Sequence, residues 1–318
     1  MSFWNPNIAP DHEPHKVMIA RDDLVDGSRD GRIVPIKIYY PVSHALSRLP
    51  VVLWSHGLGG GRDGAAFLGR FLAAHGYAVV HVQHAGTDLG LWQGKPGHPW
   101  DAIRKAVIPY ETVVDRYRDI PFILDSLPGW IESHPEVGAH MDISRMGMSG
   151  HSFGANTTQI MAGQLFGKES LSQLYEPRFK AGITYSPVAT SCRLAPEKDI
   201  YGAIKIPLFH MTGTADDSPL DDSSYKKRLA VFEQSGEPDQ HLLVLKDGDH
   251  MVFAGSRGKL AENPKRHLHE NIIKIASLAF WDAYLRQDPA AKDWLAGGGF
   301  ADWIGGEGSY AHRPASVP

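Results

Sequence analysis

The sequence predicts an α/β domain with a mostly parallel central sheet and helices on both faces. Continuous apolar runs suited to strands that are covered on both faces recur along the chain, beginning with residues 50–56. Helix-like segments separate these runs, so that strands alternate with helices as in a parallel sheet. Near the middle of the chain, residues 145–156 read as a buried strand, a very tight turn and the start of a helix.

The amino-terminal part is expected to lead into this sheet through an antiparallel strand. The first 30 residues look like an irregular arm, and residues 33–41 alternate enough to form a strand with prolines at its margins. After the next strand, residues 65–74 carry apolar side chains at helical spacing, and Gly76 ends that helix. Residues 77–82 then form another buried strand, which completes a strand-helix-strand unit.

Residues 84–110 lose this periodicity and contain Gly, Pro and Trp without a regular spacing. Loops of this length inside a compact domain are often functional. We therefore expect an insertion that acts as a lid and shapes the substrate pocket, with Trp92 in contact with substrate. A surface excursion without a role in the pocket is the alternative.

The second half of the chain continues the alternation of helices and strands, and the pattern fits one domain over residues 1–318. Residues 297–318 are expected to be a loosely ordered tail. The remaining predicted helices lie at 113–127, 153–165, 220–232 and 266–285, and the remaining strands at 180–185, 206–212 and 241–245.

Composition and charge describe an ordinary globular protein. Hydrophobic residues make up 42% of the 318 residues and charged residues 21%, which is enough apolar material for a core. The formal net charge of -4 gives no electrostatic case for a nucleic acid or an anionic membrane, so a small molecule is the expected partner. Cys192 is the only cysteine, which excludes an internal disulfide and a cysteine-based metal site.

The sequence shows no pattern typical of a secretory signal or a membrane span. The first residues show no basic segment followed by an apolar one, and no stretch reaches the roughly 20 apolar residues that span a bilayer. We therefore expect a soluble, cytoplasmic protein without membrane insertion. The sequence does not address its oligomeric state.

The run Gly150-His151-Ser152-Phe153-Gly154 fits G-x-S-x-G, the pattern of a nucleophile elbow. In that turn a serine hydroxyl is lifted above the end of a sheet, and side chains at the two glycine positions would collide where strand and helix cross. The chain contains 33 glycines, so a match could arise by chance. The hypothesis that Ser152 is a nucleophile therefore depends on its partners.

A serine nucleophile needs a histidine to remove its proton, and the histidine needs an acid to hold its tautomer. In this architecture the expected chain order is Ser, then Asp or Glu, then His, each after a strand. Asp216 and Asp217 follow one predicted strand, and His250 follows the next. We predict a triad of Ser152, Asp216 and His250, with Asp217 as the alternative acid; either aspartate could instead cap the following helix.

The oxyanion of such a reaction needs two backbone N–H donors. Phe153, directly after the serine at a helix N-terminus, is expected to supply one donor. The second is expected at Leu58, in the glycine-rich loop after the strand at 50–56. His151 beside the serine is expected to be structural or to contact substrate.

The same glycine-rich loop also satisfies a rival motif. Residues 59–64 fit G-x-G-x-x-G after a strand and before a helix, as a dinucleotide site would. Such a site also needs an acid at the end of the next strand for the ribose hydroxyl. That strand ends Val82-Gln83-His84 without an acid, so a nucleotide site is disfavoured.

With these residues in place, the chain resembles the α/β-hydrolase superfamily, and more narrowly the predicted dienelactone-hydrolase and platelet-activating-factor-acetylhydrolase-like serine esterases. The resemblance covers residues 30–296 and implies Ser152 as nucleophile, His250 as base, and Leu58 with Phe153 as oxyanion donors. The motifs that carry it are Trp54-Ser55-His56-Gly57-Leu58-Gly59-Gly60, Gly76-Tyr77, Gln83-His84-Ala85-Gly86, the serine motif, Asp249-His250-Met251-Val252-Phe253 and Ala279-Phe280-Trp281-Asp282-Ala283-Tyr284-Leu285.

Two features depart from the relatives. True dienelactone hydrolases use a cysteine where Ser152 stands, so their reaction is not implied. In platelet-activating-factor acetylhydrolases the acid follows an earlier strand, the counterpart of residues 185–188, where no acid occurs here. This favours Asp216, and a lipid substrate is therefore not implied.

The sequence thus predicts a serine carboxylic-ester hydrolase that acts through an acyl-enzyme on a small or medium ester, without a metal or other cofactor. A thioesterase or a serine peptidase with the same triad is the alternative. A catalytically inactive binding protein is a further one.

Overall fold

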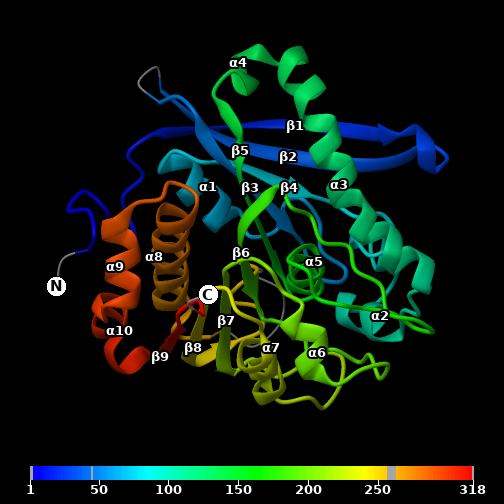
Figure 1. The fold of residues 1–318 in the computed structure, drawn as a ribbon. Helices are drawn as coiled ribbons and strands as arrows, with labels where there is room; N and C mark the ends of the chain where they lie inside the picture. The colour runs from blue at the N-terminus through cyan, green and yellow to red at the C-terminus, as the bar shows by residue number, and fades with distance from the viewer. Residues whose placement is uncertain (1–2, 44–45, 256–262, 317–318) are drawn as a thin grey trace.

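One nine-stranded sheet organises the computed structural model, which describes residues 3–43, 46–255 and 263–316 (Figure 1). The strand order is β1-β2-β4-β3-β5-β6-β7-β8-β9. Neighbours from β4 through β8 are parallel, and antiparallel pairs occur only at the two edges among the described strands. The predicted mostly parallel α/β sheet is confirmed, and every described strand joins it, while the single-domain interpretation stays a prediction.

The prediction of an irregular arm over the first 30 residues is wrong from Lys16 onward. Strand β1 (Lys16–Asp26) pairs antiparallel with β2 (Arg32–Val42) along its whole length. Side chains of β1 are mostly exposed or half-buried, and Arg21, Asp22 and Asp23 interrupt its apolar pattern. An edge strand of this kind is specified by the backbone of its neighbour, which local periodicity does not reveal.

The strand-helix-strand unit forms as predicted. Strand β3 (Leu49–Ser55) is buried throughout, α1 (Ala66–Ala74) follows, and β4 (Ala78–Val82) lies parallel to β3. Gly76 adopts φ +87, a conformation that favours glycine, and ends the helix.

The rest of the chain alternates helices and strands around β5 (Met141–His151). The other helices are α2 (Pro99–Lys105), α3 (Tyr110–Ser133), α4 (Pro135–Gly138), α5 (Phe153–Met161), α6 (Glu197–Gly202), α7 (Leu229–Gln234), α8 (Arg266–Tyr284), α9 (Pro289–Ala296) and α10 (Gly299–Ile304). The other strands are β6 (Phe179–Tyr185), β7 (Leu208–Ala215), β8 (Gln240–Asp249) and β9 (Gly308–Arg313), and 3-10 turns are η1 (Gly27–Arg29), η2 (Leu89–Leu91), η3 (Tyr225–Arg228) and η4 (Gly305–Glu307).

Several boundaries differ from the predicted ones. Helix α5 ends before Leu165, because Gly163 turns the chain at φ +115. The helix expected over 220–232 is reduced to η3 and α7. The prediction of a loosely ordered tail over residues 297–318 is also wrong, because α10 buries Phe300 and Ile304 and β9 pairs with β8. Contacts with distant parts of the chain order this segment.

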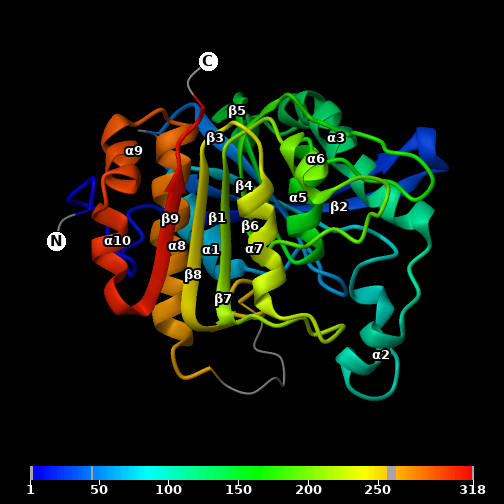
Figure 2. The ribbon, with the colours of Figure 1, turned by 60° about the horizontal axis from the view of Figure 1, so that its bottom comes forward.

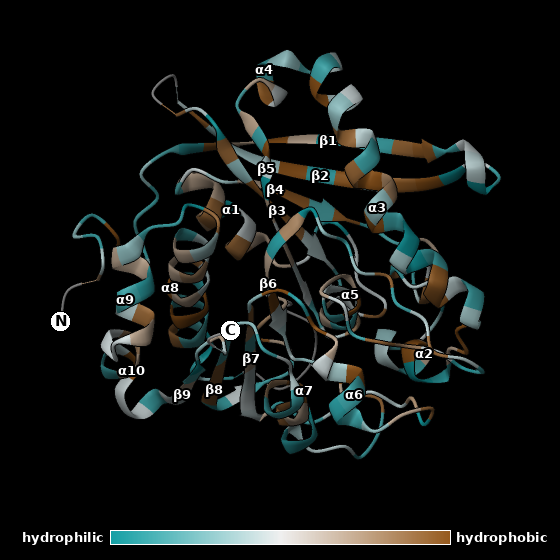
Figure 3. Cartoon of the chain, in the orientation of Figure 1, coloured by the Kyte–Doolittle hydropathy of each residue, from teal (hydrophilic) through white to brown (hydrophobic). Residues whose placement is uncertain are grey.

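Helices cover both faces of the sheet, as predicted. Figure 2 shows α8, α9 and α10 on one side and α3, α5 and α6 on the other. One apolar cluster joins the sheet to α1 and α8, and a second joins it to α3 and α5. Helix α3 carries an apolar and a polar face in Figure 3, as expected for a helix with one buried side.

This arrangement brings the ends of three parallel strands to one edge of the sheet. Strand β5 ends directly before Ser152, β7 directly before Asp216 and β8 directly before His250. Ligand sites of open α/β sheets lie outside the carboxyl ends of their strands.

Each helix in the described residues is too short or too polar to span a bilayer.

Candidate active site

Ser152 occupies a strained turn between β5 and α5. Its backbone has φ 54 and ψ -114, which non-glycine residues rarely adopt. A Cβ at Gly154 would lie 1.8 Å from the carbonyl oxygen of Ser55, and a Cβ at Gly150 would lie 2.4 Å from the carbonyl oxygen of Gly154. Strand and helix therefore cross at backbone contact, and only glycine fits the two flanking positions.

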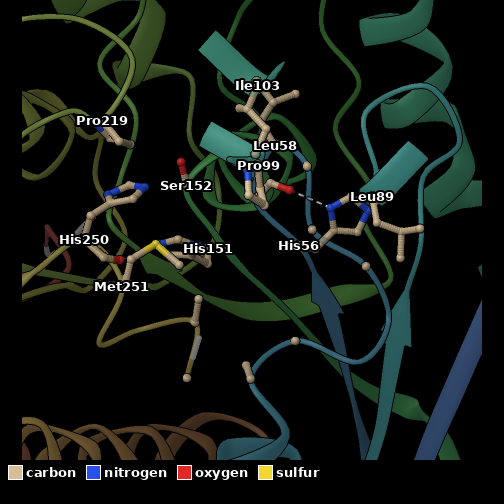
Figure 4. Close-up of a pocket in the computed structure, with 18 of the residues that line it drawn as sticks. His56, Leu58, Leu89, Pro99, Ile103, His151, Ser152, Pro219, His250 and Met251 are labelled. Carbon is tan, nitrogen blue, oxygen red and sulfur yellow. Dashed lines mark hydrogen bonds between the residues drawn. The ribbon is translucent and has the colours of Figure 1, made fainter. Parts of the chain in front are cut away.

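Ser152 and His250 both project into one cavity of about 730 Å³ (Figure 4). The Ser152 side chain is half-buried, and its hydroxyl makes no hydrogen bond to any residue that the structure describes. Catalytic hydrogen bonds are often long in unliganded enzymes and tighten only with substrate. The hydroxyl is thus available at the cavity wall.

Asp216 holds the other side of the His250 ring. The Nδ1–H of His250 donates to Asp216 Oδ1 at 2.7 Å, and the hydroxyl of Thr212 donates to Asp216 Oδ2 at 2.8 Å. Asp216 is fully buried, so its carboxylate has fixed partners. This bond leaves His250 Nε2 unprotonated in the neutral ring and able to accept a proton.

Asp217, the alternative acid, points elsewhere. Its side chain is exposed, and Oδ1 accepts the backbone N–H of Tyr225 at 2.9 Å. It therefore binds the first residue of η3, which is close to the helix-capping role considered for it. The structure brings Asp216, and not Asp217, to His250.

Arg228 is a buried cation at this cluster that the sequence reasoning missed. One of its terminal nitrogens lies 3.2 Å from Asp216 Oδ1, and its Nε donates to the Asp216 carbonyl at 2.9 Å. A second terminal nitrogen donates to the carbonyl of Pro187 at 3.0 Å. Because Arg228 follows two lysines, the sequence resembles a solvated helix face, and no local signal marks this residue as buried.

His151 supports His250 from below. Its Nε2–H donates to the carbonyl oxygen of His250 at 2.8 Å, and the two ring centroids lie 4.6 Å apart. Burial, reinforced by the neighbouring His250, holds the pKa of His151 well below its ordinary value. His151 is also part of the cavity wall, so its contact with substrate stays a prediction.

Two backbone N–H groups near Ser152, those of Phe153 and Leu58, have no acceptor in the described residues. Phe153 is the first residue of α5, where helical N–H groups have no partner within the helix. Neither the N–H of Phe153 nor that of Leu58 finds an acceptor in the described parts of the chain. The Leu58 loop lies against the serine, because a Cβ at Gly57 would be 3.4 Å from Ser152 Cβ. Their role as oxyanion donors stays a prediction, and the lack of acceptors and the contact of the Leu58 loop with Ser152 are compatible with it.

The segment 84–110 forms one wall of the cavity and packs on the same loop. The indole N–H of Trp92 donates to the Gly59 carbonyl at 2.7 Å, and Ile103 of α2 packs on Gly59. Arg104 Nε donates at 3.0 Å to the carbonyl of Pro219, a residue that also lines the cavity. The segment is therefore part of the pocket and not a surface excursion; its opening as a lid and substrate contact by Trp92 stay predictions.

The cavity is lined mainly by apolar side chains. Its volume of about 730 Å³ is ordinary for small-molecule pockets. The described residues hold no cluster of three or more His, Cys, Asp or Glu side chains placed to bind a metal ion. The large apolar residues of the lining are Trp54, Leu58, Phe67, Leu89, Trp92, Pro99, Trp100, Ile103, Pro219, Leu220 and Met251.

Comparison with known proteins supports the fold. No protein-family model matches the chain. Over 295 residues the chain is 23% identical to platelet-activating factor acetylhydrolase of Cavia porcellus. The match covers 82% of this chain and 63% of that protein, so the chain spans less than two thirds of its relative's length. Together with the parallel sheet and the turn at Ser152, this similarity shows that the chain has the α/β-hydrolase fold and is a distant homologue of platelet-activating factor acetylhydrolase.

Proposed function

We propose that the protein is a serine carboxylic-ester hydrolase with Ser152 as nucleophile, His250 as general base and Asp216 as the acid that orients it. The observation that carries the proposal is the bond from His250 to the buried Asp216, beside a strained Ser152 turn in the same cavity. The distant relationship to a protein named as an acetylhydrolase supports ester hydrolysis in general.

The first half of the reaction forms an acyl-enzyme. His250 Nε2 takes the proton from the Ser152 hydroxyl as Oγ attacks the ester carbonyl carbon. The N–H groups of Leu58 and Phe153 donate to the oxyanion that develops. The tetrahedral intermediate collapses, and the alkoxide leaves with the proton that His250 carries.

The second half releases the acid. A water molecule gives a proton to His250 Nε2 and attacks the acyl carbon, and the oxyanion again accepts the two N–H bonds. Collapse returns the proton to Ser152 Oγ and frees the carboxylic acid. Asp216 stabilises the imidazolium in both halves, and the steps require no metal or organic cofactor.

The cavity favours a small or medium apolar ester. Its lining is rich in Trp and aliphatic side chains, which bind apolar groups through burial of their surface. Because the relative is named an acetylhydrolase, an acetyl ester is the first substrate to test. An ester panel graded by acyl length, with a thioester and a peptide beside it, would separate an esterase from a thioesterase or a peptidase.

The decisive experiment is Ser152→Ala. Loss of the nucleophile should lower p-nitrophenyl acetate turnover by about 10⁴-fold or more and remove labelling by a fluorophosphonate. Circular dichroism should be unchanged, because the substitution removes only the hydroxyl oxygen. Full residual activity in Ser152→Ala would refute the proposal, and absence of labelling in the wild type would favour a binding protein.

A further inference from the structure

His56 directly follows β3, and the main chain engages both of its ring nitrogens. Its Nδ1–H donates to the carbonyl oxygen of Gly57 at 2.7 Å, and its Nε2 accepts the backbone N–H of His84 at 3.0 Å. The side chain is 2% exposed. Although His56 borders the cavity, neither nitrogen is free for a substrate.

The bond to Gly57 determines the direction of the next amide. A trans peptide is planar, with its N–H opposite its carbonyl. The Gly57 carbonyl is held by His56 and by the N–H of Gly60 at 3.0 Å. The N–H of Leu58, in the same peptide unit, must therefore point away from His56. Figure 4 draws the His56 bond as a dashed line and places Leu58 between His56 and Ser152.

A buried network fixes His56 itself through His84. Ser55 Oγ lies 3.0 Å from His84 Nε2, and Asp119 Oδ2 lies 2.9 Å from His84 Nδ1. This is a second Ser-His-Asp series, but its three side chains are fully buried and no substrate reaches them. The series instead lies behind the loop that follows His56. There it fixes His84, whose backbone N–H donates to His56 Nε2.

Arg116 contacts both His56 and Phe153 and so links this network to the two segments that carry the proposed oxyanion donors. The guanidinium donates to the His56 carbonyl and to Ser55 Oγ, the latter at 2.8 Å. It also lies 4.4 Å from the ring centroid of Phe153. Arg116 is fully buried, so these contacts are shielded from water.

The hydrogen bonds require a neutral His56 with its proton on Nδ1. Burial, together with the charge of Arg116 and the neighbouring His84, keeps the pKa of His56 well below its ordinary value. The donor to Gly57 and the acceptor for His84 are therefore maintained at neutral pH. A protonated ring could not accept the His84 N–H.

We propose that His56 is a positioning residue of the oxyanion hole: its Nδ1–H holds the Gly57 carbonyl and so directs the Leu58 N–H toward the Ser152 oxyanion. The inference rests on the proposed ester hydrolysis at Ser152. It predicts an effect on the transition state and little effect on ground-state binding, because the donor is aimed at charge that develops only during reaction.

A matched pair of variants tests which ring nitrogen matters. His56→Asn keeps an amide donor near the Nδ1 position and loses the acceptor for His84. His56→Gln places its amide near the Nε2 position and loses the donor to Gly57. We expect His56→Gln to lower kcat by about 10- to 10³-fold with KM within twofold, and His56→Asn to retain most of the activity.

Inhibition by a trifluoromethyl ketone supplies a readout that a merely structural role would not change. The ketone forms a tetrahedral adduct on serine, so its affinity should fall in His56→Gln by the same factor as kcat/KM and remain near the wild-type value in His56→Asn. All rates are expressed per site labelled by the fluorophosphonate, which removes the contribution of unfolded protein.

An unchanged kcat and ketone affinity in His56→Gln, with an active wild type, would overturn the role of His56 and leave the proposed function intact. A wild type that neither turns over esters nor is labelled would overturn the proposed function, and this inference with it. If His56→Gln does not fold, ¹⁵N NMR of the wild-type histidines decides: a proton on His56 Nδ1 supports the inference, and a proton on Nε2 overturns it.

Discussion

Replacing Asp216 by Asn removes one negative charge from a buried cluster while preserving the size of the side chain. The carboxylate accepts hydrogen bonds from His250 and Thr212 and lies 3.2 Å from the guanidinium of Arg228. The substitution therefore changes two things: which nitrogen of His250 carries the proton, and the charge balance around Arg228.

The effect on catalysis follows from the tautomer. An amide N–H₂ group facing His250 Nδ1 favours a ring with its proton on Nε2, the nitrogen that must accept the Ser152 proton. The corresponding change in a serine protease lowers kcat by about 10⁴-fold, and we expect a loss of that order here.

The effect on stability follows from Arg228. Breaking a buried ion pair by removing one partner destabilises a protein by about 3–5 kcal/mol. Arg228 keeps its bonds to the carbonyl oxygens of Asp216 and Pro187, so we expect a loss near the lower end of that range. The melting temperature should fall by several degrees.

Asp217→Asn is the matched control. This exposed side chain accepts one backbone N–H, and an asparagine oxygen can do the same, so kcat should stay within twofold of the wild type. The assay is p-nitrophenyl acetate hydrolysis at pH 8, per site titrated with a fluorophosphonate, together with thermal unfolding. A variant Asp216→Asn that keeps more than about a tenth of the wild-type kcat, against the expected 10⁴-fold loss, would refute the triad assignment. An equal loss of kcat in Asp217→Asn would contradict the assignment of Asp216 alone as the catalytic acid.

Two further predictions concern the fold. Gly154→Ala should lose more than about 3 kcal/mol of unfolding free energy or fail to fold, because its Cβ would lie 1.8 Å from the Ser55 carbonyl oxygen. The control is Gly129→Ala, which should be neutral or stabilising because a Cβ there has nothing within 4 Å, and equal urea midpoints for the two variants would contradict the prediction. Burial lowers the pKa of His84 and of His210 from 6.5 to about 4, so between these values the unfolded chain binds more protons than the folded one. The contribution of each histidine to the free energy of unfolding should therefore be largest above pH 6.5 and should fall by on the order of 3 kcal/mol as the pH drops toward 4. A urea midpoint that is constant from pH 7.5 to 4.5 would contradict this prediction.

Much of the parallel sheet could be predicted because its signals are local. Strand β3 is a continuous apolar run, and Gly76 ends α1 through its own backbone conformation. The turn at Ser152 is also local, since Gly150 and Gly154 are demanded by contacts within a few residues and with the adjacent strand. Chain order and strand ends were then enough to select Asp216 and His250 as candidates.

The edges of the sheet and the supports of the site could not be predicted in this way. Strand β1 is polar and exposed, and β9 is part of a glycine-rich tail, so each is defined by the neighbouring strand with which it pairs. Arg228 follows two lysines and resembles a surface residue, yet it is buried against Asp216. Its role depends on a contact that the chain makes only after folding.

The sequence by itself determined the central strands, the turn at Ser152 and the order of the three candidate catalytic residues, because periodicity and turn chemistry act over short stretches of chain. Only the tertiary structure showed that Asp216, and not Asp217, contacts His250, since adjacent residues at the end of a strand point in different directions. It alone also placed His56 behind the Leu58 amide. Hydrogen bonds between distant segments depend on three-dimensional distance, which no local pattern of residues encodes.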